Sequence, residues 1–208
     1  MDEIAADAAT TLKLTGRKRL SDRVMDVLGR VPRHEFVVSE YADLAYANRP
    51  LGIGHGQTIS QPFIVALMSD LLDLEGHHIV LEVGTGSGYQ TAVLSGLAEK
   101  IYSSEIIPDL ADNARERLRR LGYDNIDIRI ANGRDGFPEQ APFNAIMVTA
   151  ASPDIPPALV DQLGPGGRMI IPVGPQDGTQ YLILLVKDAQ GKISERNVLP
   201  VTFVPLVN

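Results

Sequence analysis

The sequence contains no cysteine. This absence excludes a disulfide framework, a thiolate metal site and a cysteine nucleophile. Long hydrophobic runs are lacking too, because the longest, FIVALM and LILLV, are far too short to span a bilayer. The acidic, alanine-rich N-terminus, MDEIAADAATT, has neither the positive nor the apolar region of a signal peptide. We therefore expect a soluble, cytoplasmic protein with no membrane partner.

Positive charge is scarce. The chain carries 19 Lys and Arg residues against 26 Asp and Glu residues, which gives a net charge of −7. Nucleic acid is excluded as the main partner, because a phosphate backbone requires a basic face. The one basic cluster falls on a predicted helix, where a solvated helix face is the favoured interpretation; it consists of Arg115, Arg117, Arg119 and Arg120.

Length and composition are those of one globular unit. The 208 residues are 44% apolar and 22% charged, which is enough for one sizeable core. No internal repeat and no low-complexity linker divides the chain. We expect one domain over residues 1–208, with an N-terminal cap of helices and loops over 1–60 and a core over 61–208. We also expect a monomer.

The first third of the chain predicts helices and a loop. Residues 4–14 have a weak helical pattern, and residues 21–30 a clearer one with Ser21 as N-cap. The glycine-rich, polar segment 51–61 predicts a loop. A helix over 62–72 follows, with Pro62 in its first turn.

From residue 78 onward, strand and helix patterns alternate. Strands are predicted over 78–83, 100–106, 126–131, 143–150, 168–173 and 180–187, and helices over 89–98, 109–122 and 156–163, the last closed by a GPGG turn. The terminal VTFVPLV, with its flanking proline and Pro205, predicts an edge or irregular strand. This order predicts an α/β fold: a Rossmann-like, doubly wound, mostly parallel sheet with helices on both faces and additional N-terminal helices. Ligands of such sheets bind outside the carboxyl ends of the strands.

A glycine loop with acidic neighbours lies at one of those strand ends. Gly84, Gly86 and Gly88 permit a sharp turn and a close backbone approach to a ligand. The third glycine falls one place early for the dinucleotide fingerprint. Glu82 precedes the loop, and this carboxylate favours a ligand with an ammonium or sulfonium group over a phosphate. Glu105 ends the next strand, where a carboxylate can accept hydrogen bonds from ribose hydroxyls.

These residues resemble those of S-adenosylmethionine-dependent methyltransferases. The segments IGHGQTISQPF, VLEVGTGSGYQTAVL, APFNAIMVTAA, LGPGGRMIIPVG and FVPLV are, in that order, similar to the protein-L-isoaspartate O-methyltransferase family over nearly the whole chain. The resemblance implies S-adenosylmethionine as cofactor. It also implies methylation of the free α-carboxylate of L-isoaspartyl residues in damaged proteins and peptides, which begins their repair through a succinimide.

The resemblance also implies roles for individual residues. Ser60 matches the active-site serine of the family, and Gln57, Thr58 and Ile59 match positions that line the cofactor and substrate cleft. Further matches are the methionine-moiety loop and its preceding acid, the ribose-binding acid, and a late cofactor-side position; these are Glu82, Gly84, Gly86, Gly88, Glu105 and Gln180.

Two positions depart from the family pattern. Asn132, before Gly133, replaces an aspartate that would accept a bond from the adenine amino group; Asn132 can accept through its amide oxygen without charge assistance, or can serve as a turn former. Asn144 also replaces a usual aspartate. A related carboxyl methyltransferase acting on aspartate in a modified peptide, a dinucleotide-binding oxidoreductase and a non-enzymatic module remain alternatives.

Ser60 and the histidines each have a plain structural interpretation. On the residues alone, Ser60 is an N-cap of the following helix; the family resemblance instead favours a contact with substrate, and both roles can hold together. No metal is expected, because the histidines show no metal-ligand spacing backed by nearby acids; they are His34, His55, His77 and His78.

Overall fold

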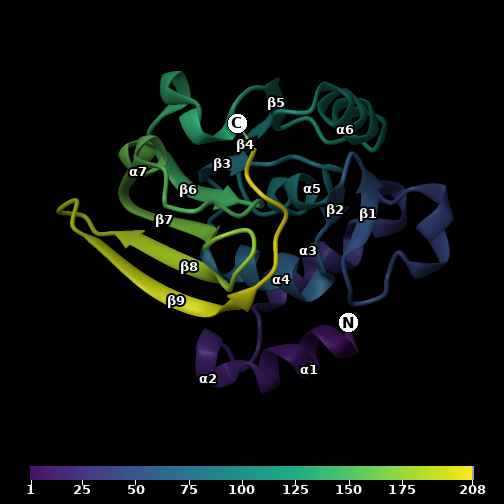
Figure 1. The fold of residues 1–208 in the computed structure, drawn as a ribbon, viewed down its shortest axis with the longest axis horizontal. Helices are drawn as coiled ribbons and strands as arrows, with labels where there is room; N and C mark the ends of the chain where they lie inside the picture. The colour runs from purple at the N-terminus through teal and green to yellow at the C-terminus, as the bar shows by residue number, and fades with distance from the viewer. Residues whose placement is uncertain (208) are drawn as a thin grey trace.

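A seven-stranded sheet forms the centre of the protein in a computed structural model that describes residues 1–207 (Figure 1). Its strand order is β5-β4-β3-β6-β7-β8-β9. The strands are β3 (Ile79–Val83), β4 (Lys100–Glu105), β5 (Ile126–Ile130), β6 (Phe143–Val148), β7 (Leu163–Val173), β8 (Gln180–Lys187) and β9 (Ile193–Val201). The pairs from β5 to β7 are parallel, whereas β8 is antiparallel to both of its neighbours. The predicted mostly parallel, doubly wound sheet is confirmed.

Helices cover both faces of the sheet. They are α1 (Asp2–Thr10), α2 (Leu12–Thr15), α3 (Asp22–Arg30), α4 (Pro62–Leu71), α5 (Tyr89–Ser95), α6 (Pro108–Arg120) and α7 (Pro157–Gln162). Val80 of β3 belongs to one buried cluster with residues of α3 to α6, and Leu81 belongs to a second with Leu159 of α7. This division follows from the alternation of side chains along a strand. Ile4 and Ala8 of α1 join the first cluster, so the N-terminal segment shares the core of the sheet.

Helix starts follow the local sequence signals, with one interruption. Ser21 is the N-cap of α3, and its side chain accepts a hydrogen bond from the N–H of Val24 at 3.4 Å. Pro62 occupies the first turn of α4, as predicted. The single helix predicted over 4–14 is wrong, because the helix breaks at Thr11, whose hydroxyl donates to the carbonyl of Asp7 at 2.7 Å. Such a bond back to the preceding turn competes with helical hydrogen bonding.

Two strand regions lie where the sequence pattern predicts none. The expected loop over 51–61 contains an antiparallel hairpin of β1 (Leu51–Gly54) and β2 (Gln57–Ile59), which turns at His55 and Gly56 with positive φ angles. The polar segment of β9 pairs with β8 at the edge of the sheet, where its outward side chains remain exposed. The predicted GPGG turn lies inside β7, with a register shift against β6. Strand pairing overrides local turn chemistry at all three places.

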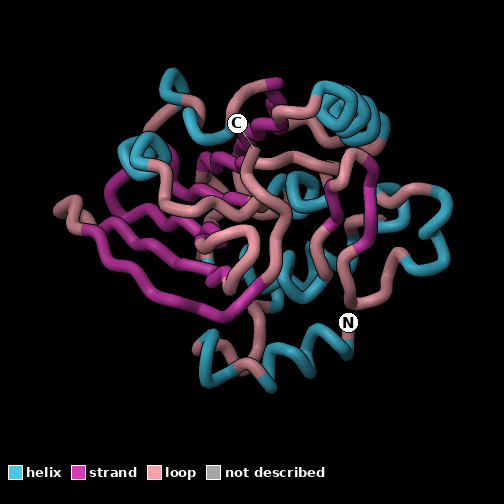
Figure 2. Tube along the Cα trace, in the orientation of Figure 1, coloured by secondary structure: helices cyan, strands magenta, loops and turns pink. Residues whose placement is uncertain are grey.

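The C-terminal segment after β9 returns to the ligand end of the sheet (Figures 1 and 2). It is irregular, as predicted. The N–H of Ala151 donates to the carbonyl of Val204 at 2.8 Å, and the N–H of Leu206 donates to the carbonyl of Ala151 at 2.7 Å. Residues 204–207 are thereby fixed beside the loop that follows β6.

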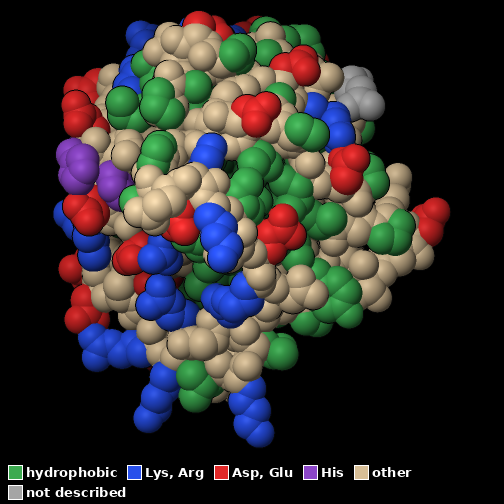
Figure 3. Space-filling view, turned by 90° about the vertical axis from the view of Figure 1, so that its left-hand side faces the viewer, with side chains coloured by type: hydrophobic (Ala, Val, Ile, Leu, Met, Phe, Trp, Pro, Cys, Tyr) green, Lys and Arg blue, Asp and Glu red, His purple; other side chains and the backbone are tan. Residues whose placement is uncertain are grey.

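The basic residues of α6 divide into two groups. Arg119 and Arg120 are exposed, which agrees with the predicted solvated face. Arg115 and Arg117 are half-buried instead and donate to the carbonyls of Ile128 and Ser87, so the prediction is wrong for these two. On the face shown in Figure 3, Lys and Arg side chains lie among Asp and Glu side chains.

Within residues 1–207, no helix is both long and apolar enough to cross a membrane.

Candidate active site

A cavity opens at the carboxyl ends of the central strands. It is lined by the end of the β1–β2 hairpin, the glycine loop after β3, the end of β4, the loops after β5 and β6, and the C-terminal segment. Of the twelve site positions predicted from the sequence, the structure brings eight to the cavity wall: Gln57, Thr58, Ile59, Ser60, Gly84, Gly86, Glu105 and Gly133. The described lining contains no Lys or Arg residue.

The glycine loop approaches a neighbouring strand end so closely that no side chain fits. Gly84 has a φ of +97°, and a Cβ atom there would lie 2.3 Å from Oγ1 of Thr149. This hydroxyl donates to the carbonyl of Gly84 at 2.6 Å. Gly88 also has a positive φ, and it precedes the first turn of α5 rather than lining the cavity. The glycines therefore shape the backbone that faces the ligand.

Glu105 joins the end of β4 to the glycine loop. Its carboxylate is 7% exposed and lines the cavity. Oε2 accepts a hydrogen bond from the N–H of Gly86 at 2.8 Å, and Oε1 accepts one from the N–H of Ile107 at 3.0 Å. Each oxygen has a second lone pair, so the carboxylate can still accept from a ligand hydroxyl.

Glu82 lies behind the loop, and the structure does not bring it to the described cavity wall. Its side chain is fully buried, and Oε2 accepts hydrogen bonds from the hydroxyls of Thr91 at 2.6 Å and Ser103 at 2.5 Å. Thr85 of the glycine loop is in turn 2.6 Å from the Ser103 hydroxyl. Burial raises the pKa of Glu82 to about 7, against the opposing effect of the two hydroxyl bonds. Glu82 therefore supports the loop from below.

Ser60 lies between two cavities. It lines the cavity of the glycine loop and also a second, open one, here called the groove, which extends toward α1 and the end of β9. The N-cap prediction for Ser60 is wrong: the N-cap of α4 is Gln61, and the helix has no side-chain cap bond. The Ser60 hydroxyl makes no hydrogen bond within residues 1–207 and is open to a ligand.

A buried arginine that sequence reasoning missed holds the Ser60 backbone. Arg33 is 1% exposed, and its guanidinium donates to the carbonyls of Ala45 and Ser60, both at 2.8 Å. It also lies over the ring of Tyr89, 4.7 Å from the ring centre. The signal in the sequence was weak, since an arginine after a proline is ordinary in a loop. The burial of its side chain is evident only in the folded structure, where other residues cover it.

The remaining predicted positions support the site from outside the cavity. The amide oxygen of Asn132 accepts from the N–H of Arg134 at 3.0 Å, which is the turn-forming role. Gln180 is buried and exchanges two hydrogen bonds with the backbone of Phe203, at 2.6 and 3.3 Å, and so anchors the C-terminal segment. Asn144 lies at the opposite end of the sheet, where its oxygen accepts from the N–H of Ile79 at 2.8 Å.

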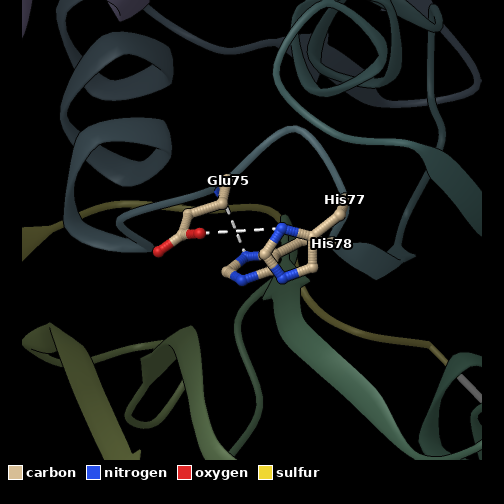
Figure 4. Close-up of side chains that lie close together, drawn as sticks. All are labelled: Glu75, His77 and His78. Carbon is tan, nitrogen blue, oxygen red and sulfur yellow. Dashed lines mark hydrogen bonds and ion pairs between the residues drawn. The ribbon is translucent and has the colours of Figure 1, made fainter.

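Two neighbouring histidines share one acidic neighbour. Figure 4 shows Glu75, His77 and His78 on the loop before β3, with their possible ligand atoms within 4.8 Å of one another. A carboxylate oxygen of Glu75 is 3.6 Å from Nδ1 of His77, so the expectation that no acid backs the spacing of the histidines is wrong for this pair. The remaining two histidines also lie near single carboxylates, at 3.9 Å and 3.6 Å. Nδ1 of His78 accepts a hydrogen bond from the N–H of Glu75 at 3.1 Å. Nδ1 of His77 thus lies beside the Glu75 carboxylate, and Nδ1 of His78 is bonded to the Glu75 backbone.

The fold and the cavity together define a Rossmann-like α/β protein with a cavity at the carboxyl ends of its strands, where ligands of such sheets bind. The chain belongs to the protein-L-isoaspartate(D-aspartate) O-methyltransferase family, whose sequence profile matches residues 9–208. The family resemblance of the sequence is confirmed.

Individual relatives cover nearly the whole chain. Protein-L-isoaspartate O-methyltransferase 2 of Polaromonas sp. strain JS666 is 55% identical over 206 residues, which are 99% of this chain and 98% of the relative. The protein of the same name from Syntrophobacter fumaroxidans is 56% identical over 204 residues, covering 98% of this chain and 83% of the relative.

Solved structures agree with this assignment. A protein-L-isoaspartate O-methyltransferase structure matches 100% of this chain and 66% of its own at 26% identity, with a TM-score of 0.86. A Plasmodium falciparum protein described by the same enzyme name, in complex with S-adenosyl-L-homocysteine, matches 99% of this chain and 97% of its own. Its identity is 26% and its TM-score is 0.78.

We expect Gly84→Ala to destabilise the protein more than Gly191→Ala. Both glycines have a left-handed φ, +97° and +83°, but a Cβ atom at Gly191 would meet nothing within 4 Å. Gly191→Ala should therefore cost about 1–2 kcal/mol from backbone strain, and Gly84→Ala a further ~1–3 kcal/mol from the clash with Thr149. Urea unfolding of both variants measures the difference. Equal losses would contradict the close approach.

We expect Glu82→Gln to change the pH dependence of stability. The pKa of Glu82 rises from 4.5 to about 7 on folding, so the folded protein binds this proton more tightly than the unfolded chain. Wild-type stability therefore falls as pH rises through this window, and the loss is complete above pH 7. The glutamine variant does not titrate, so its free energy of unfolding relative to wild type should rise by about 1–3 kcal/mol between pH 5 and 8. A constant difference across that range would contradict the burial effect.

Proposed function

We propose that this enzyme transfers a methyl group from S-adenosylmethionine to the α-carboxylate of L-isoaspartyl residues in damaged proteins and peptides. The resulting ester collapses to a succinimide, and hydrolysis restores some normal aspartate. The position of Ser60 carries the proposal, because this hydroxyl lies where the glycine-loop cavity meets the groove. A cofactor on one side and a peptide on the other would meet at this residue.

The residues of the cavity fit S-adenosylmethionine. Gly84, Gly86 and the positive-φ turn give the close backbone approach that the methionine part needs. Glu105 can accept hydrogen bonds from the ribose hydroxyls. The described lining has a carboxylate and no Lys or Arg residue, which disfavours the phosphates of a dinucleotide and favours a cation. When bound, this cofactor supplies an electrophilic methyl group on a sulfonium.

The protein is required to align and dehydrate the reacting groups rather than to remove a proton. An α-carboxylate with a pKa near ~3.5 is already ionised at neutral pH, so no strong general base is needed. Ser60 donates a hydrogen bond to this carboxylate and, with neighbouring amides, holds an oxygen in line. Gln57, Thr58 and Ile59 form the wall beside it. Positioning of this kind lowers a barrier by up to roughly 7–11 kcal/mol.

Four predicted cofactor positions act indirectly in this proposal. Glu82 supports the glycine loop through Ser103, and Gln180 holds the C-terminal segment. Asn132 forms the turn that presents Gly133, where a Cβ atom would lie 2.3 Å from a methyl group of Val83. Gly88 opens α5. A monomeric, cytoplasmic enzyme with no membrane partner remains part of the proposal, and the net charge of −7 supports the absence of a nucleic-acid partner.

Incorporation of labelled methyl groups tests the reaction directly. We expect transfer from S-adenosylmethionine to a peptide with one L-isoaspartyl residue, and release of the label under mild base, because the product is an ester. The matched peptide with normal aspartate should accept little label. Equal labelling of both peptides would instead support a carboxyl methyltransferase with another substrate. Calorimetry with S-adenosylhomocysteine and with NAD adds a further comparison, since binding of NAD alone would support an oxidoreductase.

We expect Ser60→Ala to lower kcat/KM for the isoaspartyl peptide roughly 10²-fold, which is typical for loss of one preorganised donor. Binding of S-adenosylhomocysteine should change little, because the backbone of this segment is held by Arg33. Ser194→Ala is the matched control, since Ser194 is exposed on β9 and lines neither cavity. Turnover and KM equal to wild type in Ser60→Ala would refute the role of this hydroxyl.

A further inference from the structure

The groove beside Ser60 has an acidic wall supplied by the first helix. Asp7 and Thr11, one turn apart at the end of α1, line the groove together with Pro200 of β9 and with Thr202 and Val204 after it. Asp7 is the sole ionisable residue of the described lining. It also lies outside residues 9–208, which the family profile matches. A single negative charge in an otherwise neutral groove selects among ligands by their charge.

Asp7 is held in place from the segment that carries Ser60. Its Oδ2 accepts hydrogen bonds from Nδ2 of Asn48 at 2.8 Å and from Nε2 of Gln61 at 3.3 Å. Asn48 in turn accepts from the N–H of Phe63 in the first turn of α4 at 3.0 Å. The carboxylate is therefore tied to the residue directly after Ser60, and its position relative to the reacting centre is fixed.

The second carboxylate oxygen of Asp7 is open to a ligand. Both of the bonds above go to Oδ2, and no donor within residues 1–207 reaches Oδ1. The side chain is half-buried and lines the groove, so its carboxylate is accessible to a ligand there. Amide groups hold Oδ2 without neutralising the carboxylate, so its charge acts on whatever fills the groove.

We propose that Asp7 forms a subsite for a Lys or Arg side chain that flanks the isoaspartyl residue of the substrate. This subsite rests on the proposed function, since it takes the groove to hold the peptide. Because Asp7 bonds to Gln61, which is next to Ser60, we place the cationic residue within one or two positions of the isoaspartyl residue. An acidic residue at the same position is disfavoured by repulsion from Asp7.

The experiment compares isoaspartyl peptides that differ in one side chain. Lysine, or norleucine as its neutral counterpart, is placed one or two residues before or after the isoaspartyl residue, and methyl transfer is measured with wild-type enzyme. For at least one position we expect the lysine peptide to have a KM about two- to fivefold lower, the size of an exposed ion pair. Raising NaCl from about 0.05 to 0.5 M should reduce this ratio by screening.

Asp7→Asn removes the charge while keeping an oxygen that can accept from Asn48 and Gln61, and it should abolish the preference. Asp2→Asn is the matched control, because Asp2 is exposed on the same helix, lies outside the groove and gives the same change in net charge. It should keep both the preference and the basal activity. Thr11→Lys provides an independent variant: a cation on the groove wall should lower the lysine preference at least twofold without removing Asp7.

The outcomes separate this subsite from the proposed function. Loss of the preference in Asp7→Asn, or its reduction in Thr11→Lys where Asp7→Asn does not fold, supports the subsite. Methylation of lysine and norleucine peptides with equal KM by wild type, or a preference unchanged in these variants, overturns the subsite and leaves the proposed function standing. No methylation of any isoaspartyl peptide, including the norleucine series, overturns the proposed function and the subsite with it.

Discussion

A buried carboxylate beneath the glycine loop is the constraint on which the rest of the site depends. Glu82 sits inside the sheet with one oxygen bonded to Thr91 and Ser103, and its other oxygen has no partner within residues 1–207. Burial of such a group is costly, and the cost is visible in its raised pKa. The same bonds join β3, β4 and α5 directly under the loop. These hydrogen bonds therefore hold the glycine loop, and with it one wall of the cavity, in position.

The N-terminal segment completes the site rather than only covering it. Arg33 binds the carbonyl of Ser60 from a loop that precedes the sheet, and α1 adds Asp7 to the groove through Asn48 and Gln61. The buried Arg33 and the half-buried Asp7 thus bind the same short segment, Arg33 through the backbone of Ser60 and Asp7 through the side chain of Gln61. The Rossmann-like core supplies most of the glycine-loop cavity, and the first 60 residues add Ser60 and the acidic wall of the groove.

The parts of the fold that depend on local pattern could be predicted from the sequence. Strand β3, the glycine loop and Glu105 could be predicted because each has a local signal. These signals are an apolar run, a cluster of glycines, and an acidic residue at the end of a strand. The β1–β2 hairpin and β9 were missed, since the glycine-rich segment of the hairpin and the polar segment of β9 become strands only by pairing. Arg33 and the anchoring role of Gln180 were missed for a related reason, because their partners are 27 and 23 residues away in the sequence. The family resemblance predicted Ser60 as a site residue, whereas the capping rules alone predicted it as the N-cap of a helix.

The charge balance of the two cavities explains how a site without a basic lining can hold a carboxylate. No Lys or Arg residue lines either cavity within the described part of the chain, and Glu105 and Asp7 are both acidic. A substrate carboxylate would be repelled unless a positive charge were already present beside Ser60. The sulfonium of S-adenosylmethionine has that charge, so a cavity that favours the cation alone would also accept the carboxylate once the cofactor is bound. Methyl transfer removes both charges at once, which leaves a neutral ester beside a thioether and weakens the attraction that held the substrate.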